Sequence, residues 1–185
     1  NLKNCILLCL PSDHFIKKDK IFIKNLARVI GLYNFKSICT FGIKPTEPNT
    51  EFGYIKFSGN NLQKKVVSFH EKPTLQNAEK YVKSRFFLWN SGIFITSPKL
   101  WIDSLKILNN KNFVYAQKSY YNKKIDGPFI RPSRNSFNLI KGNSIDYEII
   151  EKFSDISLDL NVCSLNVGWS DLGSYKSIDE SVFVK

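Results

Sequence analysis

The stretch "CILLCLPSDHFIKKDKIFIKNLARVIGLYNFKSICTFGI", residues 5–43, decides the fold. It opens with an apolar run that stops at Pro11, which is typical of a buried strand. Between residues 19 and 31, apolar side chains recur three or four positions apart, which indicates an amphipathic helix. Residues 37–43 are again rich in strand-forming side chains. Strand, helix and strand in succession predict an α/β protein with a mixed, mainly parallel sheet.

The remainder of the chain continues this alternation. Further elements are predicted from apolar periodicity and from proline, glycine and capping residues. These are strands at 53–57 and 64–72, the latter stopped by Pro73, a helix opened by Thr74, and a strand at 86–96 interrupted at 90–92. They are followed by a helix over 97–110 with Ser97 as its N-cap, a loop of Gly, Pro, Arg and Asn, a helix at 144–153 and a strand at 158–167. No repeat or long linker divides them, so we interpret residues 1–185 as a single partial domain.

Composition supports a globular chain with a sizeable core, because 43% of its 185 residues are hydrophobic and 15 are phenylalanine. The apolar runs are about six residues long, far short of a membrane span. The chain starts at Asn1 and contains no methionine, so we expect it to be a segment of a longer protein.

Four cysteines, Cys5, Cys9, Cys39 and Cys163, show no metal-binding or redox spacing. Cys5 and Cys9 are four positions apart in an apolar run, which would place them on one face of a strand. We therefore expect reduced core thiols and a cytoplasmic location.

A net charge of +11 is compatible with nucleic acid or with a phosphate-rich small substrate. The lysines are spread along the chain instead of forming a basic helix with interleaved aromatic residues. Charge alone therefore does not separate these two classes of ligand.

Motifs of P-loop, dinucleotide-binding, zinc-hydrolase and serine-hydrolase sites are absent from the sequence. What remains is a set of chemically versatile residues at the ends of predicted strands: Asp13, Gly53, Glu71, Lys72, Asn90 and Asp171. In open α/β sheets, ligands bind at such ends. Each residue also has a structural alternative, namely helix cap, bulge, solvated strand end or turn stabiliser.

Taken in chain order, these residues lie in motifs that resemble the sugar-nucleotide pyrophosphorylases, most closely the mannose-1-phosphate guanylyltransferases. The matching segments are "LPSDH" (10–14), "FGIKPTEPNTEFGYI" (41–55), "FHEKP" (69–73), "LWNSGIF" (88–94), "SIDYEIIEK" (144–152) and "VGWSDLGSY" (167–175). The resemblance implies a Rossmann-like nucleotidyltransferase fold. It also implies transfer of a nucleotidyl group from GTP to mannose 1-phosphate, with Mg²⁺ as cofactor.

The resemblance assigns a role to each residue. Asp13 and Asp171 would hold Mg²⁺, and Lys72 would hold the sugar phosphate, so that these three form the catalytic set. Glu71, Asn90 and the backbone at Gly53 would bind substrate around the sugar. Asp146 is interpreted as a first-turn residue of a helix, and contact with the sugar pocket makes it a further candidate for substrate binding. Such roles are physically reasonable, because joining two anionic reactants requires alignment and neutralisation of charge. Trp89 and Trp169 would wall the pocket or belong to the core.

The resemblance also has gaps. The glycine- and arginine-containing loop that binds the nucleotide in this family is not in the chain, nor is the strand before it. The chain should therefore carry the sugar-phosphate and metal half and be incomplete for turnover by itself. Glu51 and Arg85 stand where the family commonly has glycine. A carboxylate at position 51 would be unfavourable close to phosphates unless it points away.

Three functional classes stay open at this stage. The first is an enzyme domain of this family, and the second is a non-catalytic sugar-phosphate-binding module of the same fold. Nucleic-acid binding, which no motif supports, is the third. We expect no membrane partner, and the sequence leaves open a homo-oligomer and a C-terminal isomerase domain.

Overall fold

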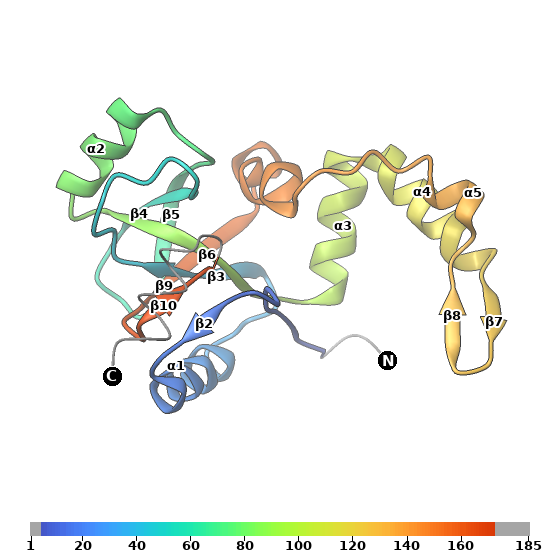
Figure 1. The fold of residues 1–185 in the computed structure, drawn as a ribbon, viewed down its shortest axis with the longest axis horizontal. Coiled ribbons are helices and arrows are strands. Elements are labelled where there is room, and N and C mark those ends of the chain that lie inside the picture. The colour runs from blue at the N-terminus through green and yellow to red at the C-terminus, as the bar shows by residue number, and fades with distance from the viewer. Residues whose placement is uncertain (1–4, 173–185) are drawn as a thin grey trace.

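A six-stranded mixed sheet lies at the centre of the fold, and the computed structural model describes residues 5–172. The strands follow one another in the order β1 (Leu7–Cys9), β6 (Phe87–Thr96), β3 (Ser37–Ile43), β9 (Asp159–Leu165), β5 (Lys64–His70) and β4 (Tyr54–Ser58). β4 pairs in addition with the start of β6, so β6 contacts three strands. The predicted α/β fold with a mixed sheet is confirmed (Figure 1).

The direction of the strands corrects one expectation. β3 and β9 pair in parallel, whereas the other described pairings of this sheet are antiparallel, in place of a mainly parallel sheet. β1 and β3 each run antiparallel to β6 and are therefore parallel to one another, with β6 between them. The strand–helix–strand unit of residues 5–43 is present, but its two strands are not neighbours, because β6 lies between them.

The helices next to the sheet lie close to the predicted ranges. α1 (Asp19–Gly31) packs Phe22, Leu26 and Val29 on one side of the sheet. α2 (Leu75–Lys83) begins after Thr74, whose hydroxyl makes no capping hydrogen bond. α3 (Pro98–Leu108) has the predicted cap, because the Leu100 amide donates to Ser97 Oγ at 3.1 Å.

Residues 110–137 form an arm that the sequence did not predict. It consists of α4 (Asn110–Tyr121), the hairpin of β7 (Lys124–Asp126) and β8 (Phe129–Arg131), and α5 (Arg134–Phe137). Figure 1 shows this arm beyond α3, on the side away from the sheet. The glycine and proline that suggested a loop instead form the two-residue turn of the hairpin, with Gly127 at φ +55.

The predicted helix at 144–153 is also replaced by something shorter. Residues Asp146–Ile150 (η2) form a single π-helical turn and Phe153–Ile156 (η3) a 3₁₀ turn. Ile149 and Ile150 nevertheless lie fully inside the core, as the apolar spacing requires. Packing against the sheet therefore sets the path of this segment more strongly than helix propensity does.

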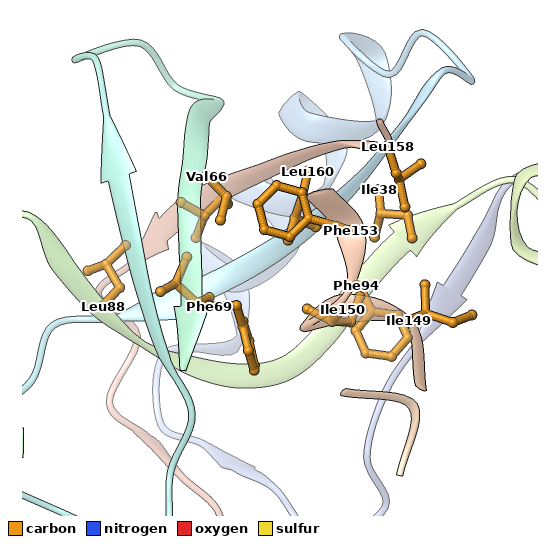
Figure 2. Packing of buried hydrophobic residues seen from close by; sticks show 12 residues of the cluster. Ile38, Val66, Phe69, Leu88, Phe94, Ile149, Ile150, Phe153, Leu158 and Leu160 are labelled. Atoms are coloured by element: carbon orange, nitrogen blue, oxygen red, sulfur yellow. The ribbon is translucent and has the colours of Figure 1, made fainter. Parts of the chain in front are cut away.

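Figure 2 shows how that core is built from distant segments. Ile149, Ile150 and Phe153 approach Ile38 of β3 and Phe94 of β6. The same cluster continues to the far strands through Val66, Phe69, Leu88, Leu158 and Leu160. The core thus fastens residues 146–153 to the sheet, and this brings Asp146 to the candidate site.

The cysteines agree only in part with expectation. Cys39 and Cys163 are buried and free, with their Sγ atoms 3.6 Å apart, and Cys9 is partly buried. Cys5 lies before β1 and is exposed, so it does not share the strand face of Cys9. The strand is shorter than its apolar run.

Two further strands, β2 (Phe15–Ile16) and β10 (Trp169–Ser170), pair antiparallel beside the main sheet. The last residues of the motif "VGWSDLGSY", 173–175, lie outside the described residues. Within residues 5–172, no helix has both the length and the apolarity to cross a bilayer.

Gly42, the last residue but one of β3, gives a test of this packing. A Cβ atom there would lie 2.7 Å from Leu88 Cβ and 2.9 Å from Val162 Cγ2. We expect Gly42→Ala to lower the free energy of unfolding by about 1–3 kcal/mol, measured by urea denaturation. Gly31→Ala is the control, since a Cβ there meets nothing within 4 Å and alanine favours a helix. Equal stability of the two variants would contradict the described packing of β3.

Candidate functional site

Four of the predicted residues meet where β4, β5, β6 and η2 approach one another. The Asn90 amide nitrogen of the backbone donates to the Gly53 carbonyl at 2.7 Å, and its side-chain Nδ2 donates to Asp146 Oδ1 at 2.9 Å. Glu71 follows β5 and lies against Gly53. We refer to Gly53, Glu71, Asn90 and Asp146 as the Asn90 cluster.

The orientation of the Asn90 side chain is determined by its surroundings. Its Oδ1 accepts the Gly92 amide at 3.2 Å, which distinguishes the oxygen from the nitrogen of the side-chain amide. Thr40 Oγ1 lies 3.1 Å from the same oxygen and 3.1 Å from the Ile93 carbonyl. Nδ2 is thereby directed at Asp146. Sequence reasoning missed Thr40, and the available signal was a hydroxyl inside the apolar strand "SICTFGI".

Gly53 is required by the close approach of Glu71. A Cβ at position 53 would lie 2.6 Å from Glu71 Oε2 and 2.8 Å from Phe69 Cζ. The register irregularity of β4 is located at Lys56 and Phe57, so Gly53 is not part of that bulge. The absence of a side chain therefore serves to bring backbone and carboxylate together.

Burial disfavours the ionised form of both acids of the cluster. Burial, followed by the negative charge of Asp146, raises the pKa of Glu71 to about 7, and the positive charge of Lys72 opposes this. Burial also raises the pKa of Asp146, while the hydrogen bond from Asn90 lowers it. Near neutral pH, Glu71 is therefore able both to accept and to donate a hydrogen bond.

Lys72 follows Glu71 directly and has left-handed backbone geometry, with φ +42, which is unusual for a lysine. Its Nζ is 3.1 Å from Glu51 Oε2. That hydrogen bond and the charge of Glu51 raise the pKa of Lys72. The lysine is thus at the edge of the Asn90 cluster, and Glu51, whose position was in doubt, points toward it.

The second group of predicted residues surrounds His14. β2 and β10 pair so that Ser170 is opposite Phe15, which brings Asp171 beside His14, the residue that follows Asp13 in the chain. Both carboxylates act on the ring, where they oppose the effect of burial that lowers the pKa of His14. The alternative that Asp13 caps a helix is not borne out, because α1 is preceded by Lys18.

Trp169 Nε1 donates to His14 Nδ1 at 3.1 Å, and the two rings meet edge to face. Nδ1 must therefore be unprotonated, which agrees with the lowered pKa of His14. A neutral imidazole leaves the two aspartate charges available to a cation. The motif "PSDH" contained His14, yet sequence reasoning gave it no role.

The two groups are neighbours. Gly92, two residues beyond Asn90, has φ +68, and a Cβ there would be 3.4 Å from Pro11 Cγ and 4.0 Å from His14 Cε1. His14, with its neighbouring aspartates, and the Asn90 cluster therefore lie beside the same bend of β6.

The side chains around His14 show which divalent metal ion could be held there. Among residues 5–172, no group of three or more His, Cys, Asp or Glu side chains is arranged to hold a metal ion. Asp13 and Asp171 supply two carboxylates only. Such a pair suits Mg²⁺, which commonly takes one or two protein carboxylates and completes its shell with water and substrate phosphates.

A cavity of about 790 Å³ is lined by neither the Asn90 cluster nor Lys72, Asp13 or Asp171. Trp89 and Trp169 both line it, together with Lys44, Lys83 and Arg85. Because successive strand residues face opposite sides of a sheet, Trp89 lies on the side of β6 away from the Asn90 side chain. Trp89 is only 6% exposed, so it belongs to the core and to the cavity wall at once.

Comparison with known proteins assigns the chain to a family. A family model described as nucleotidyl transferase matches residues 1–182. The chain belongs to the nucleotidyl transferase family. This confirms the family resemblance of the sequence motifs and the nucleotidyltransferase fold.

Among curated proteins, the chain is similar to several named mannose-1-phosphate guanylyltransferase. The chain is 38% identical to a mannose-1-phosphate guanylyltransferase of Salmonella montevideo, over 96% of this chain and 38% of that protein. It is 32% identical to a mannose-1-phosphate guanylyltransferase of Escherichia coli, over 96% of this chain and 39% of that protein. The chain therefore spans less than half the length of these relatives.

Solved structures share the fold. A Thermus thermophilus protein described as mannose-1-phosphate geranyltransferase superposes with a TM-score of 0.82 at 22% identity, covering 97% of this chain and 50% of that one. A Helicobacter pylori protein described as mannose-6-phosphate isomerase gives 0.78 at 30% identity, covering 89% of this chain and 63% of that one.

The raised pKa of Glu71 predicts a dependence of stability on pH. A carboxyl whose pKa is about 7 in the folded chain, against an ordinary value of 4.5, stabilises the fold below pH 4.5. That contribution is lost as the pH rises through about 7. Glu71→Gln should therefore be more stable than wild type by about 1 kcal/mol above about pH 8, after allowance for solvent screening.

Urea denaturation at several pH values measures this difference. The gain should disappear below pH 4.5, and Glu79→Gln, which removes an exposed acid of α2, should show no such gain. A stability difference that is the same at every pH would rule out the described environment of Glu71.

Proposed function

We propose that this chain carries the sugar-phosphate and metal half of a mannose-1-phosphate guanylyltransferase, which forms GDP-mannose and pyrophosphate from GTP and mannose 1-phosphate. The main support is the meeting of the Asn90 cluster with Lys72 and with the two aspartates around one bend of β6. The names of the curated relatives support the choice of sugar and nucleotide.

The Asn90 cluster supplies the groups that a sugar needs. Mannose offers several hydroxyls, each both donor and acceptor, and the carboxylates of Glu71 and Asp146 can accept from them. Asn90 Nδ2 now donates to Asp146 and fixes that carboxylate before substrate arrives. Gly53 allows the sugar to approach backbone as well as Glu71.

Lys72 would bind the phosphate of mannose 1-phosphate as a compact positive charge. In the reaction, an oxygen of this phosphate attacks the α-phosphorus of GTP, and the bond to the β-phosphate breaks to release pyrophosphate. By neutralising the attacking phosphate, Lys72 lowers its repulsion from the triphosphate.

Asp13 and Asp171 would hold Mg²⁺, whose chemistry is to bind phosphate oxygens and offset their charge. The hydrogen bond from Trp169 keeps Nδ1 of His14 unprotonated. A neutral His14 therefore leaves the charges of both aspartates uncompensated and available to the metal ion.

A non-catalytic module that binds a sugar phosphate is the second candidate. The ion pair between Glu51 and Lys72 favours it, because the proposed phosphate-binding lysine already has an anionic partner. We further propose a cytoplasmic location, supported by the free, buried thiols of Cys39 and Cys163.

Pyrophosphate release from GTP and mannose 1-phosphate with Mg²⁺ tests the enzyme, on this chain and on a version extended upstream. We expect activity in the extended protein, and Asp171→Asn to lower kcat by at least about 100-fold because one metal-binding charge is lost. Asp146→Asn should mainly raise KM for mannose 1-phosphate.

Asp126→Asn, in the arm, is the control and should leave kcat and KM unchanged. Mannose 1-phosphate binding without turnover in either protein would favour the module. No binding and no turnover would contradict both candidates.

A further inference from the structure

Lys72 is engaged before any substrate is present. Its Nζ lies 3.1 Å from Glu51 Oε2, so the proposed cation for the sugar phosphate is in an ion pair with a carboxylate of the same chain. A phosphate that reaches Lys72 must share the ammonium with that carboxylate or displace it.

We propose that Glu51 sets the affinity of the sugar-phosphate site by competing with the substrate's phosphate for Lys72. The proposal rests on the function proposed above, because it takes Lys72 as the phosphate-binding cation. It makes Glu51 an affinity-determining residue that weakens substrate binding and eases its release.

The backbone that carries Glu51 is held in place by its own hydrogen bonds. The Glu51 amide donates to Asn49 Oδ1 at 2.7 Å, and the Asn49 amide donates to Tyr54 Oη at 3.0 Å. Tyr54 is completely buried in β4. Residues 49–51 are thus hydrogen-bonded to β4 through Tyr54, and the Glu51 carboxylate lies within hydrogen-bonding distance of Lys72.

The backbone and the charged neighbours of Lys72 also bear on the competition. Its backbone is left-handed, with φ +42, and the negative charge of Glu71 acts on the ammonium as well as that of Glu51. Since an ammonium has three donors, it is able to contact Glu51 and a phosphate together. The two anions would then repel each other, so either sharing or displacement weakens phosphate binding.

The size of the effect follows from exposure. The Lys72 side chain is 50% exposed and that of Glu51 74% exposed. Ion pairs at such exposure are weak and screened by salt, so Glu51 modulates binding without blocking it. The expected effect is therefore a factor of a few in affinity.

Titration calorimetry of the 185-residue chain with mannose 1-phosphate provides the test. Glu51→Gln keeps the shape of the side chain and removes its charge, and we expect it to lower Kd about three- to fivefold at low salt. The difference should shrink toward zero in about 0.5 M NaCl. In a Lys72→Gln background, Glu51→Gln should change Kd by a smaller factor, since the competition for the ammonium is gone.

Asp126→Asn is the matched control. Asp126 is also an exposed acid in a surface ion pair, with Arg131, but it lies in the hairpin of the arm (Figure 1). Its substitution changes net charge by the same amount and should leave Kd unchanged. An equal effect of both variants, or none from Glu51→Gln, would overturn the proposal.

Inorganic phosphate as a second ligand separates this proposal from the proposed function. Tighter phosphate binding by Glu51→Gln, with no binding of mannose 1-phosphate by any variant, would refute the sugar substrate and support the role of Glu51. Binding of mannose 1-phosphate that is indifferent to Glu51 would refute the role of Glu51 alone. If neither ligand binds to any variant, both proposals fail.

Discussion

The pairing of β3 with β6 is the constraint on which the rest of the structure depends. The two strands run antiparallel, and their register shifts between Thr40 and Gly42. At this irregularity Asn90 lies opposite Gly42 and within hydrogen-bonding distance of Thr40. Gly92 then turns the chain through a left-handed conformation. Without this bend, β6 would not present Asn90 to Asp146 and also contact the segment that carries His14.

The candidate site gathers four acidic side chains. Glu71 and Asp146 are held near each other, while Asp13 and Asp171 flank a neutral imidazole. Accumulated negative charge of this kind costs stability in the free protein and is relieved by hydroxyl donors or cations. This accumulated charge is the physical basis for the proposal that the site binds a polyhydroxylated ligand and a metal ion.

Local patterns predicted the elements that pack directly on the sheet. α1, β3 and β9 lie close to their expected ranges, because each has a clear apolar period and a distinct end. The arm of residues 110–137 was missed, because its glycine and proline form a hairpin turn that is locally similar to a loop. Thr40 was missed because a hydroxyl in a buried strand does not show which distant residue it contacts, and its partner Asn90 is 50 positions away.

For this protein, residue order alone was sufficient to determine the family, since its short motifs at the ends of strands occur in the family's order. The same motifs also supplied the candidate site residues. Tertiary structure decided that β6 separates β1 from β3, that Asp146 reaches Asn90, and that Glu51 pairs with Lys72. These are contacts between segments distant in sequence. They depend on core packing and strand order, which apolar periodicity does not encode.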